Sequence, residues 1–437
     1  MRSSGRALER AHARTAALAG SLTAPPPPRS PSPSAVAAAA AKKASMTSLS
    51  DAPAEPPLFR FGCIADIQYC DVDDKTNATG TQFRYYRGAL RVAANAAAAF
   101  NSVQDPPVSF VVHNGDIIDH NAAFDFARDD FRDKEVGLEA LGNVLDALGA
   151  AKCPRWIFTI GNHELYNFSR KQLAEGVRAG TRGEDGVVFK AANEEGRFYY
   201  DFAPAEGWRV VVLDAYDVSI YSKGRQQGLE EEALAMLCER NPNAREWVEA
   251  NPDVVTTERM SGSFPYFKDM EGRDQRWCPF NGGIGEEQLR WLEQTLAQAA
   301  QNGERVIVFT HLLIHPETSQ SGRTLLWNYL DVLEVLEGAP PGTVAAVLSG
   351  HQHEGAMYTS EPTGTHYIVC ESPLLAQKDE PGPFAVVEVP KDGTALRFCG
   401  QGILGRSPLF HGATEPDTVV SLPLMPIAQS VASSKRE

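Results

Sequence analysis

Residues 108–119 read Val-Ser-Phe-Val-Val-His-Asn-Gly-Asp-Ile-Ile-Asp, an apolar run that leads into a glycine and two aspartates. The run over residues 108–112 predicts a buried strand, and Gly115 permits a tight turn after it. The two carboxylate oxygens of Asp116 could bridge two cations. Asp119 could orient a catalytic histidine, as outer carboxylates do for imidazoles. An aspartate that only caps a helix or a turn would also fit this stretch.

The same arrangement, an apolar strand followed by polar residues, recurs at four other places. Predicted strands at residues 59–64, 156–160, 306–309 and 344–348 lead into Asp66-Ile67-Gln68, Gly161-Asn162-His163-Glu164, Thr310-His311 and Gly350-His351-Gln352-His353. Amphipathic helices are predicted at residues 84–100, 135–148 and 286–300, and a further strand at 208–213. The alternation predicts an α/β fold, which places its functional sites just past the strand ends.

Two of these motifs offer oxygen donors. Side chains two residues apart on an extended strand end point the same way, so Asp66 and Gln68 could face one metal; a solvent-exposed turn is the alternative. Asn162 offers a carbonyl oxygen. His163 is the natural proton donor, because a pKa near about 6.5 allows proton transfer at neutral pH. A turn with Asn162 in a left-handed conformation is the competing interpretation.

The other two motifs offer imidazoles. A single histidine such as His311 is often structural, and His315 is expected to support the site or the core. His351 and His353, one residue apart after a glycine turn, could address two adjacent metals. Carboxylate, carboxamide and imidazole ligands suit Mn, Zn, Fe or Mg. Because all five motifs follow strand ends in order, we interpret them together as a metal site.

Composition restricts the function classes. The first 50 residues hold seven basic side chains and one acidic one, whereas the rest of the 437-residue chain holds 34 basic and 55 acidic ones. The acidic character of the chain after residue 50 disfavours nucleic-acid binding. It is compatible with small phosphorylated substrates if metals supply positive charge. No apolar run reaches the roughly 18–20 residues of a membrane span. The seven cysteines lack a CxxC pair, which indicates a reducing compartment rather than disulfides or a zinc finger.

The chain divides into three predicted segments. Residues 1–56 form a tail with regularly spaced arginines followed by Pro-, Ser- and Ala-rich stretches. This tail is either an organellar transit peptide or a disordered extension upstream of an alternative start at Met46, so the expected location is cytoplasmic or organellar. The catalytic domain is expected at residues 57–405. It includes an irregular insertion at about 176–280 that could shape the substrate pocket. Residues 406–437 are expected to be a C-terminal tail.

The order of the five motifs resembles the calcineurin-like metallophosphoesterases. The usual first motif of that family is Asp-x-His, and this chain has Gln68 in place of the histidine. Further motifs resemble the manganese-dependent ADP-ribose/CDP-alcohol diphosphatases, and the resemblance runs from about residue 59 to 389. These motifs are Arg84-Tyr85-Tyr86-Arg87, Asn281-Gly282-Gly283-Ile284-Gly285 before Gln288-Leu289-x-Trp291-Leu292, and Trp327-Asn328.

The resemblance implies a four-layer αββα sandwich with two divalent metal ions between strand ends. It assigns Asp66, Gln68, Asp116 and His353 to one ion, and Asp116, Asn162, His311 and His351 to the other. A glutamine in place of an imidazole favours Mn over Zn, with Mg, Zn and Fe as alternatives. The implied reaction is hydrolysis of the diphosphate bond of ADP-ribose, CDP-choline and related nucleoside diphosphate derivatives, with release of AMP or CMP. His163, held by Asp119, would stabilise or protonate the leaving group.

Single residues distinguish this chain from other metal-dependent phosphatases. Purple acid phosphatases would need a tyrosine at Asp119, and protein phosphatases an Arg-Gly pair where His120-Asn121 stand. A phosphodiesterase for cyclic nucleotides or other diesters remains an alternative with the same metals. A non-catalytic binding scaffold is disfavoured because every expected ligand position holds a donor. Aromatic side chains that could stack on a nucleobase, or belong to the core, are Tyr69, Tyr85, Tyr86, Trp327 and Tyr329. The oligomeric state stays open, and a monomer is compatible.

Overall fold

The computed structural model describes residues 55–77, 80–119, 124–125, 130–131, 134–175, 198–221, 229–250, 265–401 and 419–428. The predicted N-terminal tail falls almost entirely outside these residues. None of the described helices is long and apolar enough to cross a membrane.

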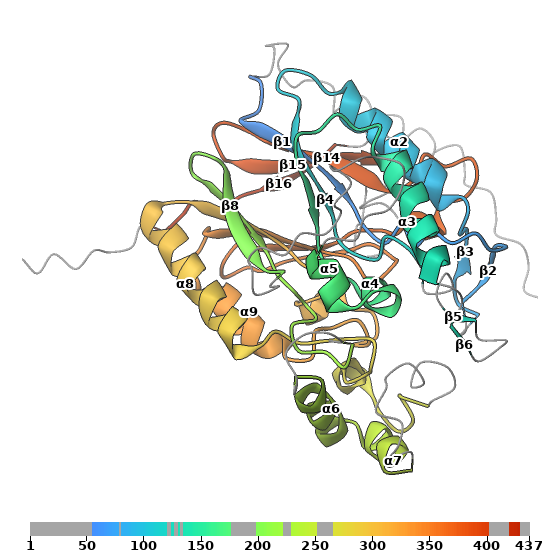
Figure 1. Ribbon diagram of the computed structural model, residues 1–437. Coiled ribbons are helices and arrows are strands. Elements are labelled where there is room, and N and C mark those ends of the chain that lie inside the picture. The colour runs from blue at the N-terminus through green and yellow to red at the C-terminus, as the bar shows by residue number, and fades with distance from the viewer. Residues whose placement is uncertain are drawn as a thin grey trace, which may run out of the picture. The chain divides into compact units, whose positions relative to one another are not determined.

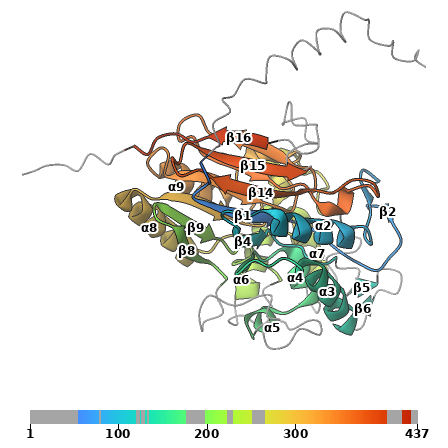
Figure 2. The same ribbon diagram turned by 90° about the horizontal axis from the view of Figure 1, so that it is seen from above.

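The first of two six-stranded sheets has the order β16-β15-β14-β1-β4-β7. Figure 2 shows β16, β15, β14, β1 and β4 in this succession. Its strands are β1 (Phe59–Ile64), β4 (Val108–His113), β7 (Trp156–Phe158), β14 (Phe384–Val389), β15 (Ala395–Gln401) and β16 (Val419–Pro423). Strands β1, β4 and β7 run parallel, and the other three extend the sheet in antiparallel fashion from β1. The carboxyl ends of the three parallel strands therefore lie at one edge of this sheet.

The second sheet has the order β12-β13-β11-β10-β9-β8. Its strands are β8 (Tyr200–Ala205), β9 (Trp208–Val212), β10 (Arg305–Phe309), β11 (Val344–Ser349), β12 (Ala356–Thr359) and β13 (His366–Val369). Strands β9, β10, β11 and β13 are parallel, and β8 and β12 pair antiparallel at the two edges. Its parallel strands likewise share one carboxyl edge.

Alternating side chains pack the two sheets against each other. In β1, Phe61 and Cys63 join Phe110 of β4 and Phe309 of β10 in a buried cluster between the sheets. The Phe61 ring stacks on Phe110 at 5.1 Å and meets Phe309 edge-on at 5.7 Å. Ile64, the residue after Cys63, faces the other way, as the two-residue period of a strand requires. Both faces of the central strands are buried, which explains why these segments are apolar throughout.

Helices cover the outer faces of both sheets (Figure 1). Helices α2 (Ala89–Ser102) and α3 (Lys134–Leu148) pack together on the first sheet, and α8 (Glu286–Asn302) and α9 (Tyr329–Gly338) on the second. A Cβ on Gly62 would stand 2.9 Å from the Phe100 ring, so glycine in β1 allows α2 its close approach. Helix α8 ends at Gly303, whose φ of 68° is the left-handed cap favoured by glycine. The predicted αββα sandwich is confirmed.

Shorter elements complete the described chain. They are β2 (Lys75–Thr76), β3 (Phe83–Arg84), β5 (Phe124–Asp125), β6 (Asp130–Phe131), α4 (Asn162–Asn167), α5 (Arg170–Glu175), α6 (Leu229–Arg240), α7 (Pro242–Ala250), and the 3-10 turns η3 (Gly272–Arg276), η4 (Pro316–Thr318) and η5 (Pro373–Leu375). The short helix α4 is the segment that the sequence marks as Gly-Asn-His-Glu.

Three sequence expectations need correction. The helix expected at 84–100 begins at Ala89, because Arg84 belongs to the β2–β3 pair. The insertion at about 176–280 contains two paired strands and two helices in its described parts, where one strand was expected. The first sheet extends past residue 405 into the expected C-terminal tail, because β16 pairs with β15 and forms the edge of the sheet. The central strands predicted in both sheets are confirmed to within two residues at their ends.

Candidate metal centre

The loops after the parallel strands of the two sheets meet and hydrogen-bond to one another. The Asp66 backbone N–H, after β1, donates to the Gly115 carbonyl after β4 at 3.0 Å. The His351 backbone N–H, after β11 in the other sheet, donates to both oxygens of the Asp66 carboxylate at 3.0 Å. Motifs separated by up to 285 residues in sequence are thus held together by direct contacts.

Four of the expected donors converge on one point. His311 Nε2 lies 3.3 Å from Asp116 Oδ2, 3.3 Å from Asn162 Oδ1 and 3.2 Å from His351 Nδ1. The other ring nitrogen of His311, Nδ1, lies 2.6 Å from the Asn114 carbonyl oxygen, to which it can only donate. In the neutral imidazole the lone pair is then on Nε2, directed at the cluster. Separations of about 3 Å are those of ligand atoms that share one cation with bonds of about 2.1 Å.

The second expected set lies next to the first. Gln68 Nε2 donates to Asp116 Oδ2 at 3.0 Å, which places the glutamine beside the candidate bridging carboxylate. Gln68 Oε1 is buried and has no hydrogen-bond partner in the structure. A buried amide oxygen without a partner is costly unless something else binds it. His353 is buried as well, with Nδ1 3.3 Å from Gln82 Oε1.

The backbone at the site is in an unfavourable conformation at four expected ligands. Six non-glycine residues in the described chain have positive φ, and four of them are Asp66 (49°), Gln68 (42°), Asp116 (58°) and His351 (65°). Such conformations cost free energy for residues with a Cβ and concentrate at functional sites. All four residues belong to the strand-end motifs, and each takes part in the contacts that join these motifs.

Two motif glycines leave room for carboxylates. A Cβ on Gly161 would lie 2.1 Å from Asp116 Oδ1, and one on Gly350 would lie 2.4 Å from Asp66 Oδ2. Real Cβ atoms do not approach oxygens so closely. Glycine at these positions is therefore required by the packing of the two aspartates.

Glu164 was not among the predicted site residues, although it stands in the Gly-Asn-His-Glu motif. Its carboxylate is buried and accepts three backbone N–H groups at 2.8 Å each, from Asp116, Ile117 and Gly161. It thereby ties the start of helix α4 to the loop after β4. The signal was present in the sequence as a glutamate three residues after a helix-capping position.

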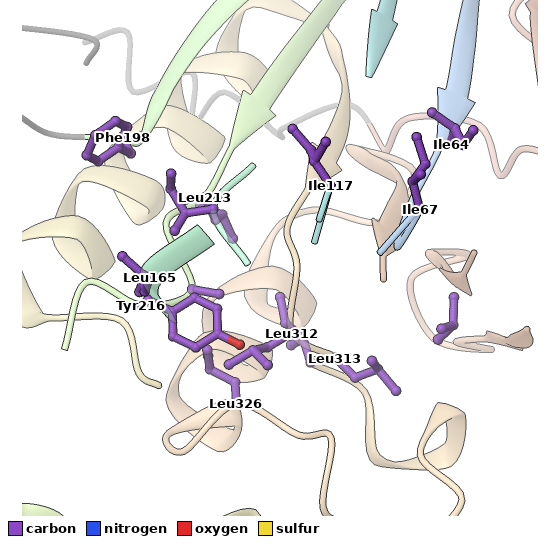
Figure 3. Close-up of a cluster of buried hydrophobic side chains, with 14 of the residues drawn as sticks. Ile64, Ile67, Ile117, Leu165, Phe198, Leu213, Tyr216, Leu312, Leu313 and Leu326 are labelled. Atoms are coloured by element: carbon purple, nitrogen blue, oxygen red, sulfur yellow. The ribbon is translucent and has the colours of Figure 1, made fainter. Parts of the chain in front are cut away.

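Tyr216, after β9, is a further residue that sequence reasoning missed. Its hydroxyl lies 3.1 Å from Asn162 Oδ1 and 3.1 Å from the Phe280 carbonyl oxygen. Its ring is packed in the apolar cluster shown in Figure 3. The Arg170 guanidinium of α5 binds both Asp214 and the Tyr216 carbonyl. This buried network fixes the tyrosine beside an expected ligand.

The pKa values show that burial opposes ionisation of the carboxylates in the cluster unless a positive charge faces them. Burial raises the pKa of Asp66 well above its usual value, and burial together with the Asp116 charge raises the pKa of Glu164 to about 7. Burial alone would lower the pKa of His311, but Asp116 raises it to about 9. Conversely, burial opposes ionisation of Asp116, but the His311 and His163 imidazoles hold its pKa below its usual range. A bound cation would supply the positive charge that protons otherwise supply to the buried carboxylates and to His311.

His163 and Asp119 lie at the border of the donor cluster. The His163 backbone N–H donates to Asp116 Oδ1 at 2.9 Å, and its ring Nε2 is 3.8 Å from Asp116 Oδ2. Asp119 is fully buried, and the nearest guanidinium nitrogen of Arg84 is 4.0 Å from Asp119 Oδ2. The expected contact between Asp119 and His163 stays a prediction.

Most of the aromatic candidates for base stacking belong to the core. Tyr69, Tyr86, Trp327 and Tyr329 are buried, and only Tyr85 is half-buried. His315 is likewise a packing residue, because its ring stacks on Tyr358 at 4.1 Å and contacts Tyr367 at 4.7 Å.

The donor set fits divalent cations. Asp116, His311 and His351 each offer a ligand atom, and these atoms lie within 4.8 Å of one another. The partnerless Gln68 oxygen and the burial that opposes ionisation of Asp66 both indicate that a cation is needed at this position. Oxygen and nitrogen donors without thiolate suit Mn, Fe, Zn or Mg.

Comparison with known proteins agrees with this geometry. Residues 59–355 match the model of the calcineurin-like phosphoesterase family. The chain is 33% identical over 355 residues to the mouse manganese-dependent ADP-ribose/CDP-alcohol diphosphatase, covering 80% of this chain and 94% of the relative. It is 32% identical to the Arabidopsis thaliana protein of the same name, covering 74% and 88% of the two chains.

A solved structure resembles the fold directly. The crystal structure of a dimetal phosphatase from Danio rerio aligns with a TM-score of 0.64 and 28% identity, covering 84% of this chain and 99% of that one. The resemblance inferred from the motifs is therefore confirmed. The chain belongs to the calcineurin-like phosphoesterase family.

Proposed function

We propose that this protein hydrolyses the diphosphate bond of nucleoside diphosphate derivatives such as ADP-ribose and CDP-choline, with release of AMP or CMP. One observation carries the proposal: donor side chains that follow five parallel strands in two sheets meet in one buried cluster. The substrate class is supported by relatives named manganese-dependent ADP-ribose/CDP-alcohol diphosphatase, of which the chain covers up to 95%.

Two divalent ions, foremost Mn²⁺, are the proposed cofactors. Asp116, Asn162, His311 and His351 would hold one ion; Asp66, Gln68, Asp116 and His353 would hold the other. When bound, such ions supply Lewis acidity toward phosphoryl oxygens and acidify water. The chain contributes the rigid donor set, since the left-handed backbone and the Glu164 hydrogen bonds hold Asp116 in place.

The proposed reaction is attack of water on one phosphorus of the diphosphate. A new P–O bond forms to the water oxygen, whose protons are released to solvent. The bond from that phosphorus to the bridging oxygen breaks, and the second phosphate leaves as a monoester. We assign to His163, beside Asp116, the stabilisation or protonation of that leaving oxygen, and to Asp119 the orientation of His163. Because a phosphate monoester is a good leaving group, the demand on a strong acid is modest.

The decisive assay uses full-length protein stripped of metal and then supplied with Mn²⁺ or Mg²⁺. ADP-ribose, CDP-choline, a cyclic nucleotide and a phosphomonoester are offered in parallel, with Asp116→Ala as the control. We expect Mn²⁺-dependent release of AMP and CMP that the control lacks. Turnover of only the cyclic diester or the monoester would refute the diphosphatase assignment, and binding without turnover would favour a scaffold.

For location we propose a reducing compartment, the cytoplasm or an organelle reached through residues 1–45. The support is that all seven cysteines are free. Fluorescent fusions with and without these residues would separate the two possibilities.

A further inference from the structure

The two histidines of the Gly-His-x-His motif are contacted at opposite ring nitrogens. His351 has its Nε2 3.0 Å from Asn281 Oδ1, while its Nδ1 faces His311 in the donor cluster. His353 has its Nδ1 3.3 Å from Gln82 Oε1. Each histidine of this motif thus meets the amide oxygen of a residue outside the five strand-end motifs.

The orientation of the Asn281 amide is determined by its own contacts. Asn281 is fully buried, and its Nδ2 donates to the carbonyl oxygens of Arg276 at 3.0 Å, Arg323 at 2.6 Å and Leu325 at 3.1 Å. Carbonyl oxygens only accept hydrogen bonds, so the amide nitrogen must face them and Oδ1 must face His351. An amide oxygen also only accepts. His351 therefore carries its proton on Nε2 and has its lone pair on Nδ1.

The Gln82 amide is oriented by a carboxylate. Gln82 Nε2 donates to Glu354 Oε1, and an ionised carboxylate only accepts. Gln82 Oε1 is left to face His353 Nδ1, which must then carry the proton, so the lone pair of His353 is on Nε2. The Gln82 backbone is held in turn, because its N–H donates to Asn77 Oδ1 at 3.2 Å in the turn between β2 and β3.

We propose that Asn281 and Gln82 are positioning residues that set opposite tautomers of His351 and His353, so that His351 binds metal through Nδ1 and His353 through Nε2. This arrangement lets adjacent histidines of one turn serve two different ions. It rests on the metal centre of the proposed function. Hydrogen bonds to the outer nitrogen of a ligating imidazole are a general means of fixing its tautomer and orientation.

Gln82 offers the cleaner test, because it is half-buried in a short turn. Gln82→Leu removes the acceptor for His353 and favours a proton on Nε2, the nitrogen that should bind metal. In Mn²⁺ titrations of the full chain followed by electron paramagnetic resonance, we expect two bound ions in the wild type. In Gln82→Leu, one site should keep its affinity and the other should weaken by about 10–100-fold.

Two further variants separate positioning from a structural effect. The double variant Gln82→Glu with Glu354→Gln exchanges the two side chains. The new glutamate at position 82 still accepts from His353, and the new glutamine at position 354 donates to it. This variant should therefore restore the affinity of the second metal site. Gln301→Leu makes the same chemical change on the exposed face of α8 and should bind both ions as the wild type does. Equal Mn²⁺ affinities in Gln82→Leu and the wild type would overturn the proposal.

The tautomers themselves can be measured without metal or substrate. Proton–nitrogen correlation spectra of protein labelled with ¹⁵N-histidine, recorded near pH 8, should show His351 protonated at Nε2 and His353 at Nδ1. Gln82→Leu should change His353 alone. His353 protonated at Nε2 in the wild type would refute the proposal even if the enzyme hydrolyses ADP-ribose. Correct tautomers and two Mn²⁺ sites without hydrolysis would refute only the proposed function.

Discussion

The Glu164 carboxylate accepts the backbone N–H of Asp116 at 2.8 Å, so a buried acid holds the residue proposed to bridge two cations. The same carboxylate accepts the N–H groups of Ile117 and Gly161. Because these donors come from the loop after β4 and from the start of α4, Glu164 joins two of the five motifs. Its role is to hold a loop whose φ at Asp116 is 58°.

Replacing Glu164 with Gln should destabilise this loop. The amide keeps one acceptor oxygen but turns an NH₂ group toward backbone N–H donors, which leaves at least one of them unpaired. Hydrogen bonds to charged groups contribute about 1.5–3 kcal/mol, so we expect the free energy of unfolding in urea to fall by at least about 2 kcal/mol. Glu286→Gln, at an exposed position at the start of α8, is the control and should stay within about 0.5 kcal/mol. Equal stability of both variants would contradict this role for Glu164.

The buried ion pair between Arg170 and Asp214 predicts a larger loss. The guanidinium donates to the carboxylate at 2.7 and 3.1 Å, and both side chains are at most 2% exposed. Asp214→Asn would leave the Arg170 charge without its counter-ion, which typically costs about 3–5 kcal/mol. Urea unfolding measures the change. The matched control is Asp201→Asn at the partly exposed Arg209 pair, where a loss of about 1 kcal/mol or less is expected.

Removal of the Tyr216 hydroxyl should affect both stability and metal binding. Tyr216→Phe deprives Asn162 Oδ1 and the Phe280 carbonyl of a nearby donor, at a cost of about 1 kcal/mol in unfolding experiments. Mn²⁺ affinity should fall by a few-fold, because the Asn162 side chain loses a contact that orients it. A variant with unchanged Mn²⁺ affinity would show that Tyr216 serves packing alone.

Thiol labelling tests the burial of the cysteines. Cys63, Cys70, Cys278 and Cys370 are buried, whereas Cys153, Cys238 and Cys399 are partly exposed. A thiolate is the reacting form, and the contact with Cys370 together with burial raises the pKa of Cys63 well above its usual value. With a chromogenic disulfide reagent we expect at most three thiols to react in the native protein and seven in urea. Rapid reaction of Cys63 would contradict the packing between the sheets.

His366 predicts a contribution to the pH dependence of stability. Burial lowers its pKa, against the opposing effect of its hydrogen bond to the Pro423 carbonyl oxygen. Below the unfolded pKa of about 6.5, the unfolded chain therefore binds more protons here than the native protein does, and stability decreases as pH falls. His366→Gln should show a smaller loss of unfolding free energy than the wild type between pH 7.5 and pH 5.5. An equal or larger loss in the variant would contradict the burial argument.

The sequence alone determined the order of strands and motifs. Apolar runs buried on both faces identify parallel strands, and polar residues after them fall at a shared carboxyl edge for topological reasons. Asp116 and His311 could therefore be assigned to one site although 195 positions separate them in the numbering, and the structure places their side chains 3.3 Å apart. The αββα architecture and the family followed from the same motifs.

Only the tertiary structure decided which residues surround those donors. Gln82 and Tyr216 carry no local pattern that distinguishes them from turn or core residues, since their partners lie 271 and 54 positions away. Asn281 stands in one of the sequence motifs, but its contact with His351, 70 positions away, is visible only in the fold. The start of α2 and the place of β16 were misjudged because pairing with a neighbouring strand, β2 for Arg84 and β15 for β16, outweighs local propensity. The candidate metal ligands follow apolar strands, so the sequence pattern reveals them. The residues that hydrogen-bond to these ligands can come from any segment that folding brings beside them, so no sequence pattern reveals these hydrogen bonds.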